Sequence, residues 1–227
     1  MCNAMLSGLA DELRKVAGIQ EEDIEIAFAL RQCIVTIDSA VFPNVSILIE
    51  INTREAQEIA GYKSPDKNPK EGYVIHVRDL SQKVGKLRRA RGIFRDCGDG
   101  TVDLFPYEDS PVISIEDCLL AIGVHEVRHR FQRGLPILFS AEHEDDSGNL
   151  LNGIIRYVRL VLEETREIYK GEGESEEYIQ RKTGPTEFDA RVIERLVVNK
   201  FLNGDVSIKE LMSLATLSPS ALLGPAP

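Results

Sequence analysis

The chain has 227 residues, of which 43 per cent are hydrophobic and 28 per cent are charged, and such proportions are typical of a globular protein with a substantial buried core. Lysine and arginine together number 27 against 37 aspartates and glutamates, and the resulting net charge of −10 argues against broad, charge-driven binding to nucleic acid or anionic membranes. No stretch approaches about 18 uninterrupted apolar residues, so we expect no membrane-spanning helix and no membrane partner.

The cysteine content and the N-terminal segment both bear on location. The four cysteines, at positions 2, 33, 97 and 118, include no C-x-x-C pair, which favours a reducing compartment over a disulfide framework. The segment 1–18 lacks a basic start followed by an apolar run, so we expect no secretion signal. Together these features predict a cytoplasmic protein.

The first hundred residues are predicted to form an N-terminal α/β region (1–100). Apolar residues at helical spacing predict a helix over 5–16, while 21–38 fits a helix that gives way to a strand. The segments 45–51 and 73–77 are rich in β-branched or alternating apolar residues and predict strands.

Two polar segments connect these elements. Asn52 and Glu55 have the spacing of a capping box and predict a short helix that ends at Gly61. The segment 62–72 contains two prolines and charges of both signs, and it predicts a loop.

A cluster of basic residues lies at 83–95. Its members are Lys83, Lys86, Arg88, Arg89, Arg91 and Arg95. In a chain this acidic, such a cluster is either a contact for nucleic acid or an acidic partner, or a solvated helix face that balances acids elsewhere. The second arrangement is the commoner one, so nucleic acid is the weaker of the partner predictions.

The remaining elements follow in order along the chain. The segments 92–95 and 101–105 flank a glycine-containing turn and predict a hairpin. Apolar periodicity predicts helices over 149–169 and 188–201, and the polar segment 171–185 between them predicts a flap or an unstructured connection. Ser207 and Glu210 have capping spacing and predict a last short helix.

A buried helix over 115–133 carries the most specific motif of the chain. Ser114 and Asp117 have the spacing of a capping box at its start, apolar residues cover most of its sides, and Gly134 with Pro136 can end it. The H-E-x-x-H motif described next lies in the second half of this helix.

His125 and His129 lie four residues apart with Glu126 after the first of them, an H-E-x-x-H sequence. On a helix, residues at this spacing share one face, so both imidazoles can reach one ion. Such a pair suits Zn²⁺, and Glu126 is then placed to take a proton from a water molecule as a general base. The alternative is a hydrogen-bonded pair of core histidines beside a surface glutamate.

A catalytic zinc site needs a third protein ligand. The metzincin extension would place a glycine and a histidine three and six residues after the second motif histidine, where this chain has Gln132 and Leu135. The candidates are therefore His143, Glu187 and Asp189. Asp189 also has capping spacing from Thr186, three residues earlier, which gives it a structural alternative, and His143 lies in a strongly acidic segment typical of exposed loops.

With these residues in view, the chain resembles the zincin metallopeptidases, and within them the gluzincin-like branch. The resemblance rests on HEVRH at 125–129 and on Glu187 and Ala190, which form an E-x-x-A sequence. In that branch a glutamate from a downstream helix, in this context, is the third metal ligand. The resemblance therefore implies that Glu187 completes a Zn²⁺ site with the two motif histidines, in a zincin-like core at 101–204 followed by a short helix and tail at 205–227.

The chain also departs from the family pattern in two places. Zincins favour uncharged residues around the motif, where this chain has Arg128 and Arg130. Some metallopeptidases place an aspartate four residues after the ligand glutamate, where this chain has Arg191. Both differences bear on peptidase activity more than on metal binding. The residue that would stabilise an oxyanion is open among Tyr157, Tyr178 and the motif arginines.

These observations predict an α+β fold in which a small mixed or antiparallel sheet packs on a helical half that carries the metal helix. The predicted function is zinc-dependent hydrolysis of an intracellular protein or peptide, with Glu126 as the catalytic base. One alternative is a catalytically weak or inactive zincin-fold module for regulation or interaction, with nucleic acid as a partner through 83–95. Another is a zinc hydrolase that does not act on peptides.

Overall fold

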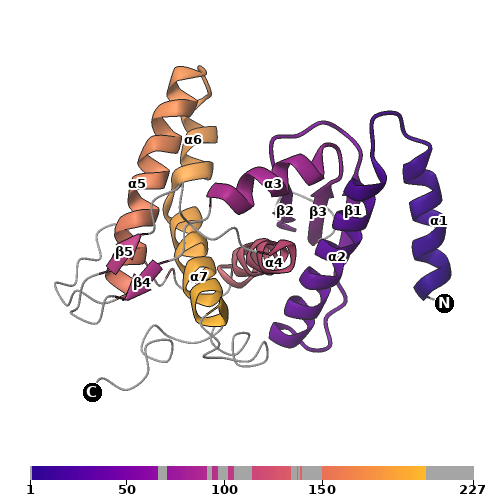
Figure 1. Cartoon of the computed structure of the whole chain (residues 1–227), viewed down its shortest axis with the longest axis horizontal. Helices are drawn as coiled ribbons and strands as arrows, with labels where there is room; N and C mark the ends of the chain where they lie inside the picture. Colours follow the sequence, from indigo (N-terminus) through magenta and orange to yellow (C-terminus); the bar gives the residue numbers. More distant parts are fainter. Residues whose placement is uncertain are drawn as a thin grey trace. The chain divides into compact units, whose positions relative to one another are not determined.

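The computed structural model describes residues 2–65, 71–90, 94–96, 102–104, 114–133, 137, 139 and 150–202. These residues form a mostly helical α+β protein with one small mixed sheet (Figure 1), which confirms the α+β class and the small sheet of the prediction. The chain divides into two compact units. Unit 1 comprises Met1–Ala90 and Val112–Glu126, and unit 2 comprises Arg91–Pro111 and Val127–Pro227.

Unit 1 is built around a three-stranded sheet. Its elements are α1 (Cys2–Arg14), α2 (Glu21–Val41), β1 (Leu48–Asn52), β2 (Ala60–Lys63), β3 (Gly72–His76), α3 (Leu80–Ala90) and the first part of α4 (Ile115–Phe131). The strand order is β1-β3-β2, with β3 parallel to β1 and antiparallel to β2. The central strand is the most buried of the three, as expected for a strand paired on both edges.

Two buried carboxylates of α2 are satisfied by hydrogen bonds within unit 1. Asp23 accepts from the backbone N–H groups of Gln20, at 3.1 Å, and Ser81, at 2.8 Å, so one side chain caps the starts of α2 and α3. Asp38 accepts from the Tyr73 hydroxyl on β3 at 2.7 Å. These bonds compensate for the cost of burying the two acids.

The first part of α4 packs closely on α2. At Gly123 an added Cβ would stand 2.8 Å from Cδ1 of Ile37 and 3.6 Å from Cβ of Cys33. The first distance is too short for two carbon atoms, so the missing side chain is what lets the two helices approach. The buried residues around it, including Cys118, Ala121 and Val124, then join the core of unit 1.

Unit 2 is mainly a set of packed helices. It contains β4 (Phe94–Asp96), β5 (Val102–Leu104), the end of α4, α5 (Leu150–Gly171), α6 (Glu176–Thr183) and α7 (Pro185–Leu202). Helix α5 contacts both α6 and α7, and α6 contacts α7 (Figure 1). The core is lined by apolar residues at helical spacing on α5 and α7: Ile154, Ile155, Val158, Leu162, Phe188, Val192, Ile193 and Leu196.

The predicted hairpin and most of the predicted helices are present. Strands β4 and β5 pair antiparallel, with Phe94 opposite Leu104, and the turn between them lies outside the described residues. Helices α1, α5 and α7 match the helices predicted from periodicity. The predicted short helix at 207–210 lies outside the described residues.

The prediction of a strand in the second half of 21–38 was wrong, because α2 is a single helix from Glu21 to Val41. The strand prediction rested on the alternation of Cys33, Val35 and Ile37. The buried apolar residues of α2 instead recur every three or four positions, as on one face of a helix: Ile24, Ala27, Leu30, Ile34 and Ile37. Cys33 and Val35 are half-buried apolar residues outside this row, and they hid the helical period in the sequence.

Two further predictions from polar segments were also wrong. Asn52 does not cap a helix: its side-chain oxygen accepts from the backbone N–H of Arg54 at 2.9 Å in a local turn, and the predicted end at Gly61 lies inside strand β2. The segment 171–185 contains a helix, α6. Ser175 caps it by accepting from the N–H of Tyr178 at 3.2 Å, and Ile179 is its buried residue.

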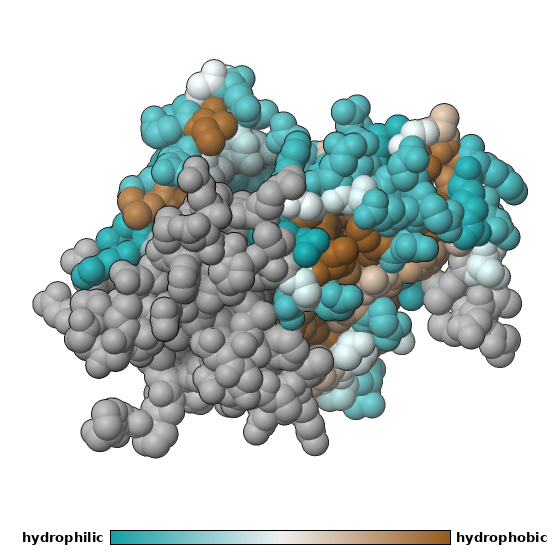
Figure 2. Space-filling view, viewed as in Figure 1, coloured by the Kyte–Doolittle hydropathy of each residue, from teal (hydrophilic) through white to brown (hydrophobic). Residues whose placement is uncertain are grey.

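The visible surface is mostly polar. In the view of Figure 2, hydrophilic residues make up most of the coloured surface, and hydrophobic residues gather in an area near the middle of the view. The described part of the chain contains no helix both long and apolar enough to cross a membrane.

Candidate metal site

The helix that carries the H-E-x-x-H motif begins where the sequence predicts. The hydroxyl oxygen of Ser114 accepts from the backbone N–H of Asp117 at 3.0 Å and donates to the Asp117 carboxylate at 2.7 Å. This bond satisfies one of the free backbone donors at the start of α4. From there α4 runs without interruption to Phe131, so His125 and His129 lie one turn apart on the same continuous helix.

The two motif histidines meet Glu187 from the first turn of α7. One ligand-type atom from each of His125, His129 and Glu187 lies within 4.8 Å of the others. Nε2 of His129 lies 3.4 Å from Oε2 of Glu187. Of the three third-ligand candidates, Glu187 is therefore the one that lies beside the motif histidines within the described residues.

The chemistry of this set of donors suits a zinc ion, and one of its distances can be compared with zinc geometry. Two imidazoles and one carboxylate form a ligand set found in catalytic zinc sites, which leave a position for water or substrate. Zinc holds such ligands at about 2.0–2.2 Å, so two ligand atoms on one tetrahedral ion lie roughly 3.3–3.5 Å apart. The His129–Glu187 separation of 3.4 Å has this length.

The second oxygen of Glu187 faces a guanidinium. Nε of Arg191, one turn later on α7, lies 2.8 Å from Oε1 of Glu187 in an ion pair. Burial opposes the charge on Arg191, but attraction by Glu187 and Glu194 outweighs it, so the pKa of Arg191 is raised. With Oε1 paired in this way, Glu187 presents Oε2 to the histidine.

Glu126 is a buried acid with an unused acceptor. Its side chain is 7 per cent exposed, and its Oε2 has no hydrogen-bond partner among the residues that the structure describes. A buried carboxylate oxygen without a donor is costly unless something polar reaches it. A water or substrate proton beside the motif histidines would meet that requirement.

Asp189 is excluded as a ligand by its own contacts. The side chains of Asp189 and Arg128 are 0 and 1 per cent exposed, and Nε of Arg128 donates to Oδ2 at 2.8 Å. Asp189 also accepts from Nη2 of Arg128 at 3.3 Å, from the N–H of Phe139 at 3.1 Å and from the amide of Gln132 at 2.8 Å. These four bonds fill the acceptor positions of a carboxylate.

Asp189 therefore has a structural role, as predicted, but the predicted capping role was wrong. Helix α7 begins at Pro185, so Thr186 lies inside its first turn and does not cap it together with Asp189. The carboxylate instead holds Arg128 of α4. Arg128 is one of the two arginines that depart from the zincin pattern, and its burial in this ion pair gives that departure a structural reason.

The structure gives the contacts of three tyrosines that bear on the predicted oxyanion-stabilising residue. Of the two predicted oxyanion-stabilising tyrosines, Tyr157 accepts from Arg195 at 3.3 Å, and Tyr178 packs edge-on against Tyr169 with ring centroids 5.3 Å apart. Burial raises the pKa of Tyr169, and Tyr178, Arg191 and Glu187 also act on it. Tyr169 is thus the tyrosine whose electrostatic neighbours include Glu187, and periodicity gave no sign of it.

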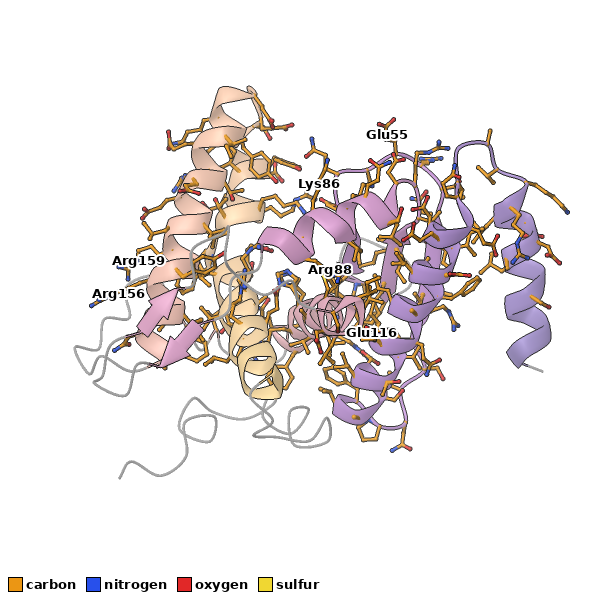
Figure 3. The ribbon with its side chains drawn as sticks, viewed as in Figure 1. Glu55, Lys86, Arg88, Glu116, Arg156 and Arg159 are labelled. Carbon is orange, nitrogen blue, oxygen red and sulfur yellow. The ribbon has the colours of Figure 1, made fainter. Side chains whose placement is uncertain are left out.

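His143 and much of the basic segment lie outside the described residues. For 83–95, Lys83 donates to the backbone oxygen of Arg78 at 2.8 Å, while Lys86 is exposed and Arg88 is half-buried on α3 (Figure 3). The side chains of the three later arginines of the segment are not described. Lys83 thus has a structural role, and nothing described gathers these charges into one nucleic-acid surface.

Comparison with known proteins gives no relative for this chain. No protein-family model, curated protein or solved structure matches it at a significant level. The function is therefore argued from the residues and from the arrangement of α4 and α7.

Proposed function

We propose that the protein is a zinc-dependent, metallopeptidase-like hydrolase that acts on an intracellular protein or peptide, in the cytoplasm. The observation that carries this proposal is the approach of Nε2 of His129 to Oε2 of Glu187, at 3.4 Å, with His125 one turn away on the same helix. Two imidazoles and a carboxylate on one point are what a catalytic zinc ion requires, and the H-E-x-x-H order supplies a base beside them.

Each residue has a distinct role in the proposal. His125, His129 and Glu187 hold Zn²⁺, which when bound lowers the pKa of water and polarises a carbonyl group. Glu126 takes the proton from the attacking water through its unpartnered Oε2 and later gives a proton to the leaving amine. Arg191 holds the carboxylate of Glu187 so that one oxygen points to the histidines. Tyr169 is the candidate to donate to a developing oxyanion.

Replacing Glu126 tests the catalytic role. Glu126→Gln keeps the size of the side chain but removes the base, so we expect cleavage of fluorescently labelled casein to fall by about 100-fold or more, with zinc binding retained. Glu116→Gln is the matched control, because Glu116 is an exposed acid of the same helix (Figure 3). Undiminished cleavage by Glu126→Gln would remove Glu126 from its assigned role.

Replacing the candidate third ligands tests the metal assignment. In a competition titration with a chromophoric chelator, Glu187→Ala should bind zinc far more weakly than the wild type, whereas His143→Ala should bind it as tightly. The reverse result would transfer the third position to His143.

A zinc-binding module without hydrolytic activity is the second candidate function. The observation that favours it is the ion pair between Arg191 and Glu187, which puts a positive charge where some metallopeptidases have an aspartate. In that case the wild type binds one zinc ion per chain through the same ligands, while neither casein nor small ester substrates are cleaved above the rate of Glu126→Gln.

A further inference from the structure

Gln132 lies just after the end of α4 and connects three parts of unit 2. Its backbone N–H donates to the carbonyl of Arg128 at 2.9 Å, which holds the residue close to the last turn of the helix. Its side-chain amide contacts Nδ1 of His129 at 3.0 Å, the carboxylate of Asp189 at 2.8 Å and the backbone oxygen of Thr186 at 2.8 Å. One side chain thus joins a candidate metal ligand to two groups of α7.

The chemistry of these partners fixes which way the amide faces. The ionised carboxylate of Asp189 and the carbonyl of Thr186 can only accept hydrogen bonds, so they take the two N–H groups of the Gln132 amide. The amide oxygen is then the atom left for His129. Because that oxygen can only accept, Nδ1 of His129 must carry a hydrogen.

A hydrogen on Nδ1 leaves the lone pair of the neutral imidazole on Nε2. Nε2 is the atom that lies 3.4 Å from Oε2 of Glu187. Two acceptor atoms then face each other, an arrangement that is unfavourable without a positive charge between them. The contacts of Gln132 therefore prepare His129 to bind a cation in the direction of Glu187.

We propose that Gln132 is a positioning residue that sets the tautomer and the orientation of His129 for metal binding. This inference rests on the proposed function for the identity of the metal. The amide is itself anchored, because Asp189 is held in place by its buried ion pair with Arg128. The network runs from that ion pair through Gln132 to His129, and it acts on zinc only through the histidine.

The test uses the full chain labelled with ¹⁵N-histidine and two variants of Gln132. Gln132→Met removes the amide with little change in size. Gln132→Glu keeps an acceptor for His129 but loses the donors to Asp189 and Thr186. Gln32→Met is the matched control, because Gln32 is an exposed glutamine on α2.

The first readout is the tautomer of His129 in metal-free protein at about pH 8, where an ordinary imidazole is neutral. The ¹⁵N shifts, assigned with His129→Ala, should show hydrogen on Nδ1 in the wild type, in Gln32→Met and in Gln132→Glu. In Gln132→Met we expect a mixture of the two tautomers. A merely structural role for Gln132 would not move this balance.

The second readout is zinc affinity, measured by competition with a chromophoric chelator. Loss of such a supporting hydrogen bond should weaken binding about 10–100-fold in Gln132→Met, with Gln132→Glu closer to the wild type. The inference is overturned if Gln132→Met keeps a single Nδ1–H tautomer, or if Gln132→Glu loses as much affinity as Gln132→Met. If the wild type takes up no zinc while the tautomer still follows Gln132, the proposed function fails and the tautomer assignment stands.

Discussion

Buried carboxylates occur in two regions of the molecule, and their surroundings differ. In unit 1, Asp23 receives two backbone N–H groups and Asp38 receives the hydroxyl of Tyr73. At the end of α4 and the start of α7, Oε1 of Glu187 pairs with Arg191 and its Oε2 lies 3.4 Å from Nε2 of His129, while Oε2 of Glu126 has no hydrogen-bond partner among the described residues. Both regions bury charge, but only the second keeps a buried carboxylate oxygen without a described donor, that of Glu126.

The difference indicates which buried acids the fold itself explains. A buried charge is tolerated when hydrogen bonds or an opposite charge replace its lost hydration. Asp23 and Asp38 meet this condition as parts of the framework, and Asp189 meets it through Arg128. Glu187 meets it through Arg191. Glu126 does not meet it fully among the described residues, and in the proposed function a bound water or substrate would supply the missing donor.

The largest expected effect on stability comes from breaking the buried ion pair between Arg128 and Asp189. Asp189→Ala leaves a buried guanidinium without its partner, and we expect a loss of about 3–5 kcal/mol in the free energy of unfolding, measured by urea titration. The double variant Arg128→Met/Asp189→Leu should recover much of that loss, because no unpaired charge remains. A single variant as stable as the wild type would show that the pair does not hold α4 to α7.

Adding zinc should stabilise the protein by binding to His125, His129 and Glu187, independently of the hydrogen bond between Tyr73 and Asp38. At a free zinc concentration of 100 times the dissociation constant, we expect a gain of about 2.7 kcal/mol, measured as a shift in the urea midpoint. His129→Ala should lose this gain and Tyr73→Phe should keep it. An equal gain in His129→Ala would mean that zinc binds elsewhere.

Removing the hydroxyl of Tyr73 should cost less than breaking the ion pair. Tyr73→Phe takes one donor from the buried Asp38, so we expect a loss of about 1–3 kcal/mol in the free energy of unfolding. Zinc affinity, measured on the same preparation, should not change. A change in zinc affinity would show that the surroundings of Asp38 and the candidate metal site depend on each other.

The smallest effect is expected at the exposed pair of Lys170 and Glu167. The hydrogen bond from Lys170 lowers the pKa of Glu167, so its slight stabilisation exists above the ordinary carboxyl pKa and is lost as the pH falls through the lowered value. Lys170→Gln should raise the pKa of Glu167, followed by NMR, without a measurable change in stability, because both side chains are exposed. A clear loss of stability would show that exposed pairs matter here.

Local signals allowed much of the fold and part of the site to be predicted. The cap at Ser114 and the spacing of the two motif histidines depend only on neighbouring residues and on helix geometry. Glu187 was reached through the resemblance to the zincins, and it does lie beside His129. The cap and the helical spacing could be predicted because they need no knowledge of which distant segments pack together, whereas the role of Glu187 as a metal ligand stays a prediction.

The roles that the sequence could not give depend on contacts between distant residues. Gln132 was noticed only as a residue that breaks a metzincin pattern, although its amide reaches Thr186 and Asp189, more than fifty residues away. From the sequence, Arg128 was only a difference from the zincin pattern; its burial depends on Asp189, which lies far along the chain on α7. In α2, the apolar residues Cys33 and Val35 lie outside the buried row, and the sequence alone did not show which apolar residues the rest of unit 1 would bury.

The proposal that His125, His129 and Glu187 hold Zn²⁺ is tested most directly by zinc X-ray absorption spectroscopy on the wild-type protein loaded with one equivalent of zinc. We expect nitrogen and oxygen neighbours at about 2.0–2.2 Å, with scattering from two imidazole rings, and no sulfur. Loss of one ring in His125→Ala would assign it to the motif. A sulfur neighbour at about 2.3 Å, or zinc that remains hydrated in solution, would show that the two histidines and Glu187 do not form the zinc site.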